Sequence, residues 1–221
     1  MGYLDFLQNY GPQFLDGAAI TLAQTGMATV LALVIALTVG MFLRAPNIFV
    51  QRAATVYVEF FRGTSLLVQL YVIFFVLPLF GFTLDKFVAG FLAVGLNLGA
   101  YGAEVVRGAI LSVPKGQWEA AVALNMSSRT QMVRVILPQA FLLMLPALGN
   151  LLIELLKGTA LVALISVADL MFVSKQINGS TYLSVQAFGT ALGFYYVIAR
   201  FVITPTMRYL ERIMARRVGR A

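Results

Sequence analysis

Residues 119–138 read EAAVALNMSSRTQMVRVILP, and this polar stretch lies between two long apolar segments of the chain. Its first part, residues 119–124, is rich in Ala, which is the best helix former. Asn125 comes next, and Asn tolerates the left-handed conformation that commonly ends helices. The pattern therefore predicts a short helix that stops in a tight turn.

The second part of the same stretch predicts another helix. Either Ser127 or Ser128 can cap that helix, and Gln131 completes a capping box if Ser128 is the cap. Pro138 marks a helix boundary, because the residue before proline is pushed out of the α region. The whole polar loop, residues 112–138, is thus expected to form a helix–turn–helix between two apolar segments.

The composition identifies a membrane protein. Of 221 residues, 60% are hydrophobic and 11% are charged, whereas soluble domains carry about 25% charged residues. Cys and His are both absent, which excludes disulfides and removes the commonest metal ligands and general bases. The net charge of +7 comes from Lys and Arg that flank apolar segments, so membrane topology explains it better than binding to nucleic acid.

Five apolar segments are long enough to cross a bilayer, so the fold class is an all-α polytopic membrane protein. The predicted spans are residues 18–43, 63–80, 87–111, 139–157 and 185–204. Residues 1–17 lack Lys and Arg, so we expect a short interfacial lead-in and no signal peptide. Residues 46–61 predict either a helix along the membrane surface or a first turn of the second span. Residues 1–221 are expected to form a single transmembrane domain.

Residues 158–173 are apolar enough to suggest a sixth span, but the distribution of basic residues favours five. With five spans, twelve cations collect on one side: Arg44, Arg52, Arg62, Arg107, Lys115, Arg129, Arg134, Arg208, Arg212, Arg216, Arg217 and Arg220. Lys86 and Lys175 lie on the other side, and Lys157 and Arg200 at span ends. The N-terminus is then outside and the C-terminus cytoplasmic. Residues 158–173 become a partly inserted or interfacial outer segment, with Asp169 facing water or protein.

The sequence contains no obvious catalytic or nucleotide-binding motif. There is no GxxxxGK[ST] phosphate loop, and no carboxylate pair has a nearby base or metal partner. Gly95, Gly99 and Gly102 have the small-xxx-small spacing that allows close helix packing. We therefore expect no enzyme activity and no metal site in this chain, and energy must come from another protein or an ion gradient.

Polar residues form one stripe on each of two predicted spans, at spacings i, i+4 and i+7. The stripes are Asn97, Tyr101 and Glu104 on one span, and Asn150, Glu154 and Lys157 on the other. Charges in hydrocarbon cost on the order of 3 kcal/mol or more and usually face a bundle interior or a wet cavity. One hypothesis is a substrate path, in which Glu154 meets an ammonium group and Lys157 a carboxylate.

A structural interpretation of the stripes stays open beside that hypothesis. Glu154 and Lys157 can pair with each other at i, i+3, and Lys157 can extend toward the interface. Glu104 can pair with Arg107 in the same way. Asn97 needs a hydrogen-bond partner, which another helix can supply as well as a substrate.

Glu119-Ala120-Ala121 and Ile136-Leu137-Pro138 resemble the "EAA" signature of ATP-binding-cassette importer permeases. Residues 60–64 (FFRGT), 100–108 (AYGAEVVRG) and 115–119 (KGQWE) resemble the polar-amino-acid branch of that family. The similarity covers nearly the whole chain. In one departure, Asn125 replaces the signature glycine, and Asn is the next-best residue for positive φ.

The resemblance implies a type I importer whose 112–138 loop docks in a groove of a separate ATPase subunit, which binds ATP and Mg. The coupling residues would be Glu119, Ala120, Ala121, Asn125, Arg129 and Arg134, and the two arginines would pair with acidic groups of that partner or with lipid phosphate. The other implied partners are an extracytoplasmic solute-binding protein and a second permease subunit, identical or paralogous, in a bacterial inner membrane.

The implied function is uptake of polar amino acids or similar zwitterions. Residues 157–161 (KGTAL) resemble a family run in which Asp follows the Lys and Ser follows the Thr. Gly158 and Ala160 depart from it, which also admits an ectoine-type solute. Two alternatives remain: a stand-alone secondary carrier or channel that uses Glu154 as a coupling group, and a structural membrane-assembly protein.

Overall fold

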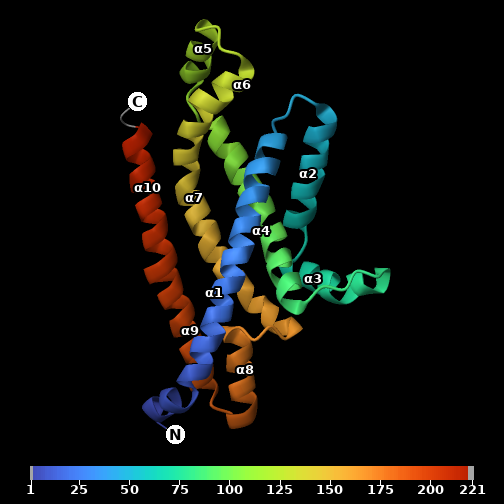
Figure 1. Cartoon of the computed structure of the whole chain (residues 1–221), viewed down its shortest axis with the longest axis vertical. Helices are drawn as coiled ribbons and strands as arrows, with labels where there is room; N and C mark the ends of the chain where they lie inside the picture. Colours follow the sequence, from blue (N-terminus) through green and yellow to red (C-terminus); the bar gives the residue numbers. More distant parts are fainter. Residues whose placement is uncertain (1, 219–221) are drawn as a thin grey trace.

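The computed structural model describes residues 2–218, so Arg220 of the basic tail lies outside the described residues. Its α-helices are α1 (Tyr3–Phe42), α2 (Ile48–Gly63), α3 (Leu66–Tyr71), α4 (Lys86–Leu111), α5 (Lys115–Ala123), α6 (Ser128–Gln131), α7 (Leu137–Gly158), α8 (Leu170–Thr181), α9 (Ser184–Val197) and α10 (Thr204–Val218) (Figure 1). Three π-helical segments, η1 (Val72–Val76), η3 (Met132–Ile136) and η5 (Ile198–Ile203), and two 3-10 segments, η2 (Leu77–Phe80) and η4 (Thr159–Ile165), join them. The all-helical class is confirmed.

Four helical stretches within residues 2–218 are long and apolar enough to cross a membrane. They are Tyr3–Phe42, Lys86–Leu111, Ser128–Ile165 and Ser184–Met214. A fifth span is obtained if Ile48–Gly63 and Leu66–Phe80, which meet at an angle of 102°, count as one broken span. The predicted number of five therefore agrees with the upper count.

The α1–α4 contact forms the centre of the bundle and depends on small residues. A Cβ added to Gly102 would lie 2.7 Å from the Cβ of Ala36, and one added to Gly99 would lie 2.8 Å from a methyl group of Ile35. Gly95 faces Leu31 in the same way. The predicted packing role of these three glycines is confirmed, because the two helices could not approach this closely with side chains there.

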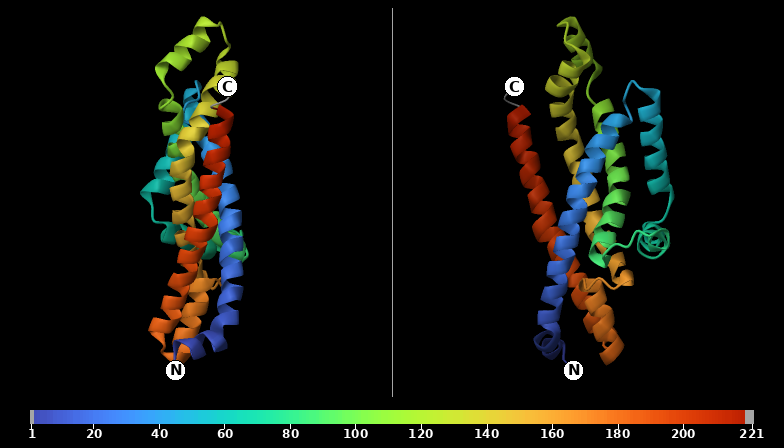
Figure 2. Two further views of the ribbon diagram at one scale, coloured as in Figure 1. Left: turned by 90° about the vertical axis from the view of Figure 1, so that its left-hand side faces the viewer. Right: turned by 45° about the vertical axis from the view of Figure 1, so that its right-hand side comes forward.

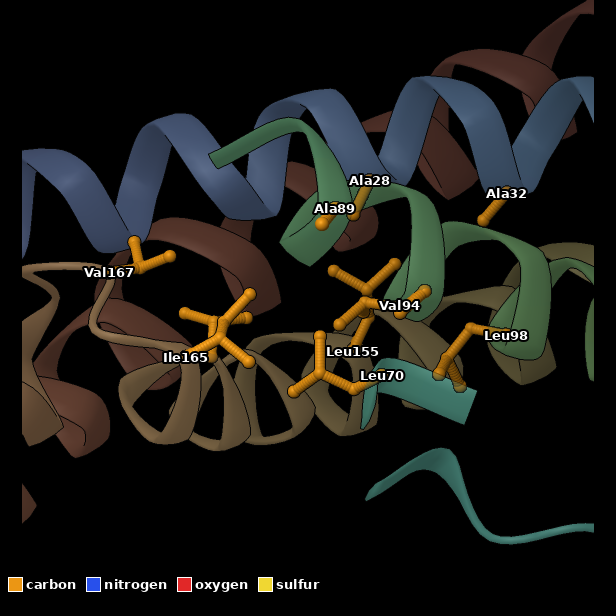
Figure 3. Close-up of a cluster of buried hydrophobic side chains, with 11 residues drawn as sticks. Ala28, Ala32, Leu70, Ala89, Val94, Leu98, Leu155, Ile165 and Val167 are labelled. Atoms are coloured by element: carbon orange, nitrogen blue, oxygen red, sulfur yellow. The ribbon is translucent and has the colours of Figure 1, made fainter. Parts of the chain in front are cut away.

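One buried cluster joins this helix pair to the rest of the fold. Ala28 and Ala32 of α1 face Ala89, Val94 and Leu98 of α4 (Figure 3). Leu155 of α7, Leu70 of α3, and Ile165 and Val167 near η4 close the cluster from the other side. The broken span and the 3-10 segment are thus fixed against the same core as the long helices.

The second span was predicted over residues 63–80, whereas in the structure the candidate span is the bent pair of α2 and residues 66–80. The chain bends between α2 and α3, so α2 runs beside α1 and α4 while α3 points away from the bundle (Figures 1 and 2). Ala54 and Val58 of α2 pack with Leu43 and with Ala103 of α4. This packing also excludes the interpretation of residues 46–61 as a helix that only lies along the membrane surface.

The predicted helix boundary at Pro138 is also wrong, because α6, η3 and α7 form one continuous helix. Proline lacks an N–H and its ring clashes with the carbonyl four residues earlier, which for Pro138 is that of Arg134 in the π turn. The wider π turn accommodates the missing N–H and the proline ring without ending the helix. The other two π segments likewise precede Pro78 and Pro205 by two residues.

Both ends of the chain are more helical than predicted. Residues 3–17 form the first part of α1, and Phe6 and Phe14 are fully buried against α8 and α9. This segment is therefore not a separate lead-in. At the other end, α9, η5 and α10 continue the fifth span into the basic tail.

Residues 158–173 do not form a sixth span. They comprise the end of α7, the η4 turn, a left-handed residue at Ser166 with φ 62°, and the start of α8. Asp169 caps α8 by accepting from the backbone N–H of Phe172 at 2.8 Å, and its other oxygen accepts from the Tyr195 hydroxyl at 3.2 Å. Of the two environments predicted for Asp169, the structure gives protein, since its side chain is fully buried.

The connections between the helices, and the two ends of the chain, lie at one or the other end of the bundle. The α1–α2 connection, the hairpin of α5 and α6, and the C-terminus share one end, whereas the N-terminus and α8 lie at the other (Figures 1 and 2). Arg44 and the cations of α5, α6 and α10 therefore belong to one end. Arg62 does not, because it is at the opposite end of α2 from the α1–α2 connection.

Candidate functional site

The hairpin formed by α5 and α6 has the turn that the sequence predicts. Asn125 adopts a positive φ of 55°, and the backbone N–H of Met126 donates to the carbonyl of Ala121 at 3.1 Å. Ser127 is the N-cap of α6, with its hydroxyl accepting from the backbone N–H of Thr130 at 3.3 Å. The alternative with Ser128 as the cap and Gln131 completing a capping box is not formed, because Ser127 is the cap and the Gln131 side chain donates to the Trp118 carbonyl.

Side chains fix the hairpin to its own stem. Gln131 is buried and donates to the backbone carbonyl of Trp118 in α5 at 3.0 Å. Gln139 in α7 donates to the side-chain oxygen of Gln117 at 3.1 Å. The guanidinium of Arg44, just beyond α1, lies 6.0 Å from the Trp118 ring centroid. These contacts join the hairpin to α7 and to the end of α1.

The predicted coupling residues present a polar surface at the end of the bundle. Glu119, Ala120, Asn125, Arg129 and Arg134 are exposed. Ala121 is the exception at 2% exposure, so its small size serves packing inside the hairpin.

The two polar stripes meet at a cavity of about 540 Å³. Its lining includes Asn97 and Tyr101 from α4, Glu154 and Lys157 from α7, and Thr64 from the α2–α3 bend. Four of the six predicted path residues are thus brought together, whereas Glu104 lies on another cavity and Asn150 is exposed elsewhere on α7. We refer to this space as the stripe cavity.

Asn97 is buried and fixes the α2–α3 bend. Its amide nitrogen donates to the backbone carbonyl of Phe61 at 2.9 Å and to the side-chain oxygen of Gln69 at 3.1 Å. Gln69 in turn donates to the hydroxyl of Thr64 at 2.6 Å and to the carbonyl of Phe61 at 3.0 Å. The alternative that another helix satisfies Asn97 is confirmed, and the network holds one wall of the stripe cavity rigid.

Glu104 pairs closely with Arg107, as the structural interpretation predicted. One carboxylate oxygen lies 2.7 Å from Nη2 and 3.1 Å from Nε of that guanidinium. The second oxygen lies 3.9 Å from Arg62, a residue that the sequence interpretation placed among loop cations. Its position directly before the predicted span of residues 63–80 was the signal that could have identified it.

Glu154 and Lys157 differ from Glu104. Both side chains are exposed, and among the described residues neither takes part in an ion pair within 4.0 Å, so the predicted pair between them is not formed. Their charges are available to a solute in the stripe cavity. This arrangement offers a carboxylate and an ammonium on one wall, opposite the hydroxyl and amide groups of α4 and the bend.

A second cavity, of about 570 Å³, lies between α7 and α9 and is almost wholly apolar. Lys157 is the charged residue in its lining, beside Phe188, Tyr195 and Tyr196. Apolar walls without convergent polar groups are a poor site for a zwitterion, since they cannot replace its hydration. The stripe cavity is therefore the better candidate for a polar solute.

Comparison with known proteins gives consistent matches over the chain. Residues 28–216 match the family described as "Binding-protein-dependent transport system inner membrane component". A probable amino-acid ABC transporter permease of Sinorhizobium fredii is 43% identical over 98% of this chain and 91% of its own length. An L-cystine transport system permease of Bacillus subtilis is 35% identical over 96% and 91%. The crystal structure of an amino acid ABC transporter with histidines superposes with a TM-score of 0.88 at 34% identity, over 96% of this chain and 98% of that one.

Proposed function

This chain belongs to the family of binding-protein-dependent transport system inner membrane components, and from that premise we propose its solute class, solute path and docking element. It is the permease subunit of an ATP-driven importer and a multi-pass protein of the bacterial inner membrane. The family places ATP hydrolysis on a separate subunit. The partners are accordingly ATPase subunits and an extracytoplasmic solute-binding protein.

The proposed solutes are polar amino acids. Support comes from the names of the most similar relatives, which are amino-acid, cystine, arginine and glutamine permeases. The stripe cavity supplies the matching chemistry, because Glu154 and Lys157 can meet the ammonium and carboxylate groups of one zwitterion. This pairing of charges in one cavity is the observation that carries the proposal.

The proposed docking element is the α5–α6 hairpin. Its exposed Glu119, Arg129 and Arg134 offer charges to the ATPase or to lipid phosphate. Its buried link through Gln131 supports the stiffness that a lever requires. Hairpin and C-terminus would be cytoplasmic and the N-terminus outside, in keeping with the clustering of cations at that end of the bundle.

Two permease subunits, identical or paralogous, would enclose the solute path between them. ATP binding by the partner subunits would draw the two hairpins together, tilt α4 and α7, and switch access from inside to outside. The stripes would then be exposed to each side in turn.

The test is reconstitution of the permease with its co-purifying ATPase and binding protein in liposomes. Uptake of labelled amino acids should need ATP and all components, and Glu154→Gln should lower uptake while co-purification of the ATPase is unchanged. The matched control is Glu119→Gln, which should lower ATPase association and not solute selectivity. Uptake driven by an ion gradient without the ATPase would overturn the proposal, and unchanged uptake by Glu154→Gln would remove that residue from the path.

A further inference from the structure

Arg62 is a cation within the broken span. It is the penultimate residue of α2 and directly precedes the bend into α3. Charged residues at membrane depth are costly and commonly mark ion or substrate paths. The bend beside it is rigid, because Asn97 and Gln69 both bind the carbonyl of Phe61. The Arg62 side chain therefore projects from a fixed backbone position.

The Arg62 guanidinium makes weaker contacts than the guanidinium of Arg107 beside it. Its approach to Glu104 is 3.9 Å, longer than a hydrogen bond, and the facing carboxylate already binds Arg107 at 2.7 Å. The ring centroid of Tyr101 lies 5.4 Å from the guanidinium carbon. The Arg62 side chain remains 43% exposed. It is thus a positioned cation, and among the described residues the one carboxylate within 4.0 Å of it is that of Glu104.

Arg62 and Tyr101 stand between two cavities. Tyr101 lines the stripe cavity, whereas Arg62, Glu104 and Arg107 line a polar cavity of about 430 Å³ between α2 and α4. The guanidinium carbon of Arg62 and the ring centroid of Tyr101 are 5.4 Å apart, so the linings of the two cavities approach each other at this pair.

We propose that Arg62 binds the carboxylate of the solute as it passes from the stripe cavity to the polar cavity. The solute carboxylate would take the place of the distant Glu104 contact, and the guanidinium fork would bind it in the two-pronged manner that arginine favours. Tyr101 would keep the guanidinium plane oriented. Glu104 would then act as the competitor that recovers Arg62 once the solute has left. This inference rests on the proposed function and adds a binding residue to it.

The test uses liposomes that contain the permease, its co-purified ATPase and binding protein. Labelled L-glutamine, L-arginine, L-histidine and L-cystine are the probes, and the one that the wild-type protein transports fastest is used for all variants. Arg62→Gln removes the charge and Arg62→Lys keeps it. Arg52→Gln is the matched control, because Arg52 is an exposed arginine on the same helix that lines neither of these cavities.

We expect Arg62→Gln to lower transport turnover about ten-fold or more, since a charge-assisted hydrogen bond is lost. Arg62→Lys should recover turnover to within about three-fold of wild type, since an ammonium keeps the charge without the fork. Arg52→Gln should match wild type. Glu104→Gln should raise turnover about two-fold, because it removes the competitor and leaves an amide oxygen for Arg107.

Wild-type turnover in Arg62→Gln would overturn the inference, and so would equal losses in Arg62→Gln and Arg62→Lys. If Arg62→Gln does not assemble, Glu104→Gln decides, because a loss of turnover in that variant would mean that the ion pair is a structural bridge. A wild-type complex that moves none of the four probes would refute the proposed function and this inference with it. Normal wild-type uptake with unaffected Arg62 variants would refute the inference alone.

Discussion

The side-chain amide of Gln131 donates a hydrogen bond to the backbone carbonyl of Trp118, and the 3.0 Å contact joins α6 to α5 across the turn at Asn125. Gln131 is 8% exposed, so the bond is shielded from water. Trp118 in turn lies beside Arg44 at the end of α1. This one amide therefore joins the two helices of the hairpin beside the end of α1.

Replacing Gln131 should loosen the α5–α6 hairpin. Gln131→Leu removes this second donor from the Trp118 carbonyl, which keeps its helical bond within α5, so the loss is that of one hydrogen bond, about 0.5–1.5 kcal/mol. We expect the stimulation of ATPase activity by solute-loaded binding protein to fall while the ATPase still co-purifies. Gln117→Leu is the control, since its contact with Gln139 is exposed and its loss should change little. Full stimulation in Gln131→Leu would show that this bond does not transmit motion.

The turn itself can be tested at Asn125, where φ is 55°. Asn125→Val should destabilise the hairpin by ~1–2 kcal/mol, because a Cβ-branched residue is strained in the left-handed region. Asn125→Gly should be close to neutral, since glycine adopts positive φ without steric cost. Hydrogen exchange of the amides of residues 116–131, followed by mass spectrometry, should be faster in the valine variant. Equal exchange rates in the two variants would contradict the strained geometry.

Glycine-to-alanine substitutions at two positions of α4, one inside and one outside the contact with α1, should change stability in opposite directions. Gly102→Ala places a Cβ 2.7 Å from that of Ala36 and should lower stability by about 1–3 kcal/mol through overpacking. Gly108→Ala, in the same helix, meets nothing within 4 Å and should gain up to about 1 kcal/mol from helix propensity. Thermal unfolding in detergent measures both shifts. A midpoint for Gly102→Ala at or above that of Gly108→Ala would refute the close-packing interpretation.

The sequence was informative where a local pattern has one structural solution. The glycine spacing at residues 95, 99 and 102 predicted close packing, and Asn125 predicted the left-handed turn, because both depend on the presence or conformation of a single Cβ. The bend between α2 and α3 could not be predicted in this way. Residues 66–80 have the composition of a straight span, and the bend depends on tertiary hydrogen bonds from Asn97, far along the chain.

The candidate site was predicted in part for the same reason. Spacing on one helix placed Glu154 and Lys157 near each other, but it could not decide whether they pair, which depends on their rotamers and on the cavity beside them.

Pro138 was predicted to be a helix boundary because proline usually is one. The π turn that accommodates it has no local sequence signature apart from the proline, so the continuous span was visible only in the structure.

Asp169 ties the segment from η4 to α8 to the bundle, and its two roles can be separated by mutation. Asp169→Ala removes the N-cap of α8, which costs about 0.5–2 kcal/mol, and leaves the Tyr195 hydroxyl without its acceptor, which adds about 1–3 kcal/mol. Asp169→Asn keeps an oxygen for one of these partners and should lie between wild type and alanine in stability.

Asn47→Ala is the control for capping alone, because Asn47 caps α2 from an exposed position. Thermal unfolding of the four proteins should rank wild type and Asn47→Ala above Asp169→Asn, and Asp169→Ala lowest. An Asp169→Ala protein as stable as Asn47→Ala would mean that the buried contact with Tyr195 contributes nothing, and that the segment from η4 to α8 is held by apolar packing of Leu170 and its neighbours instead.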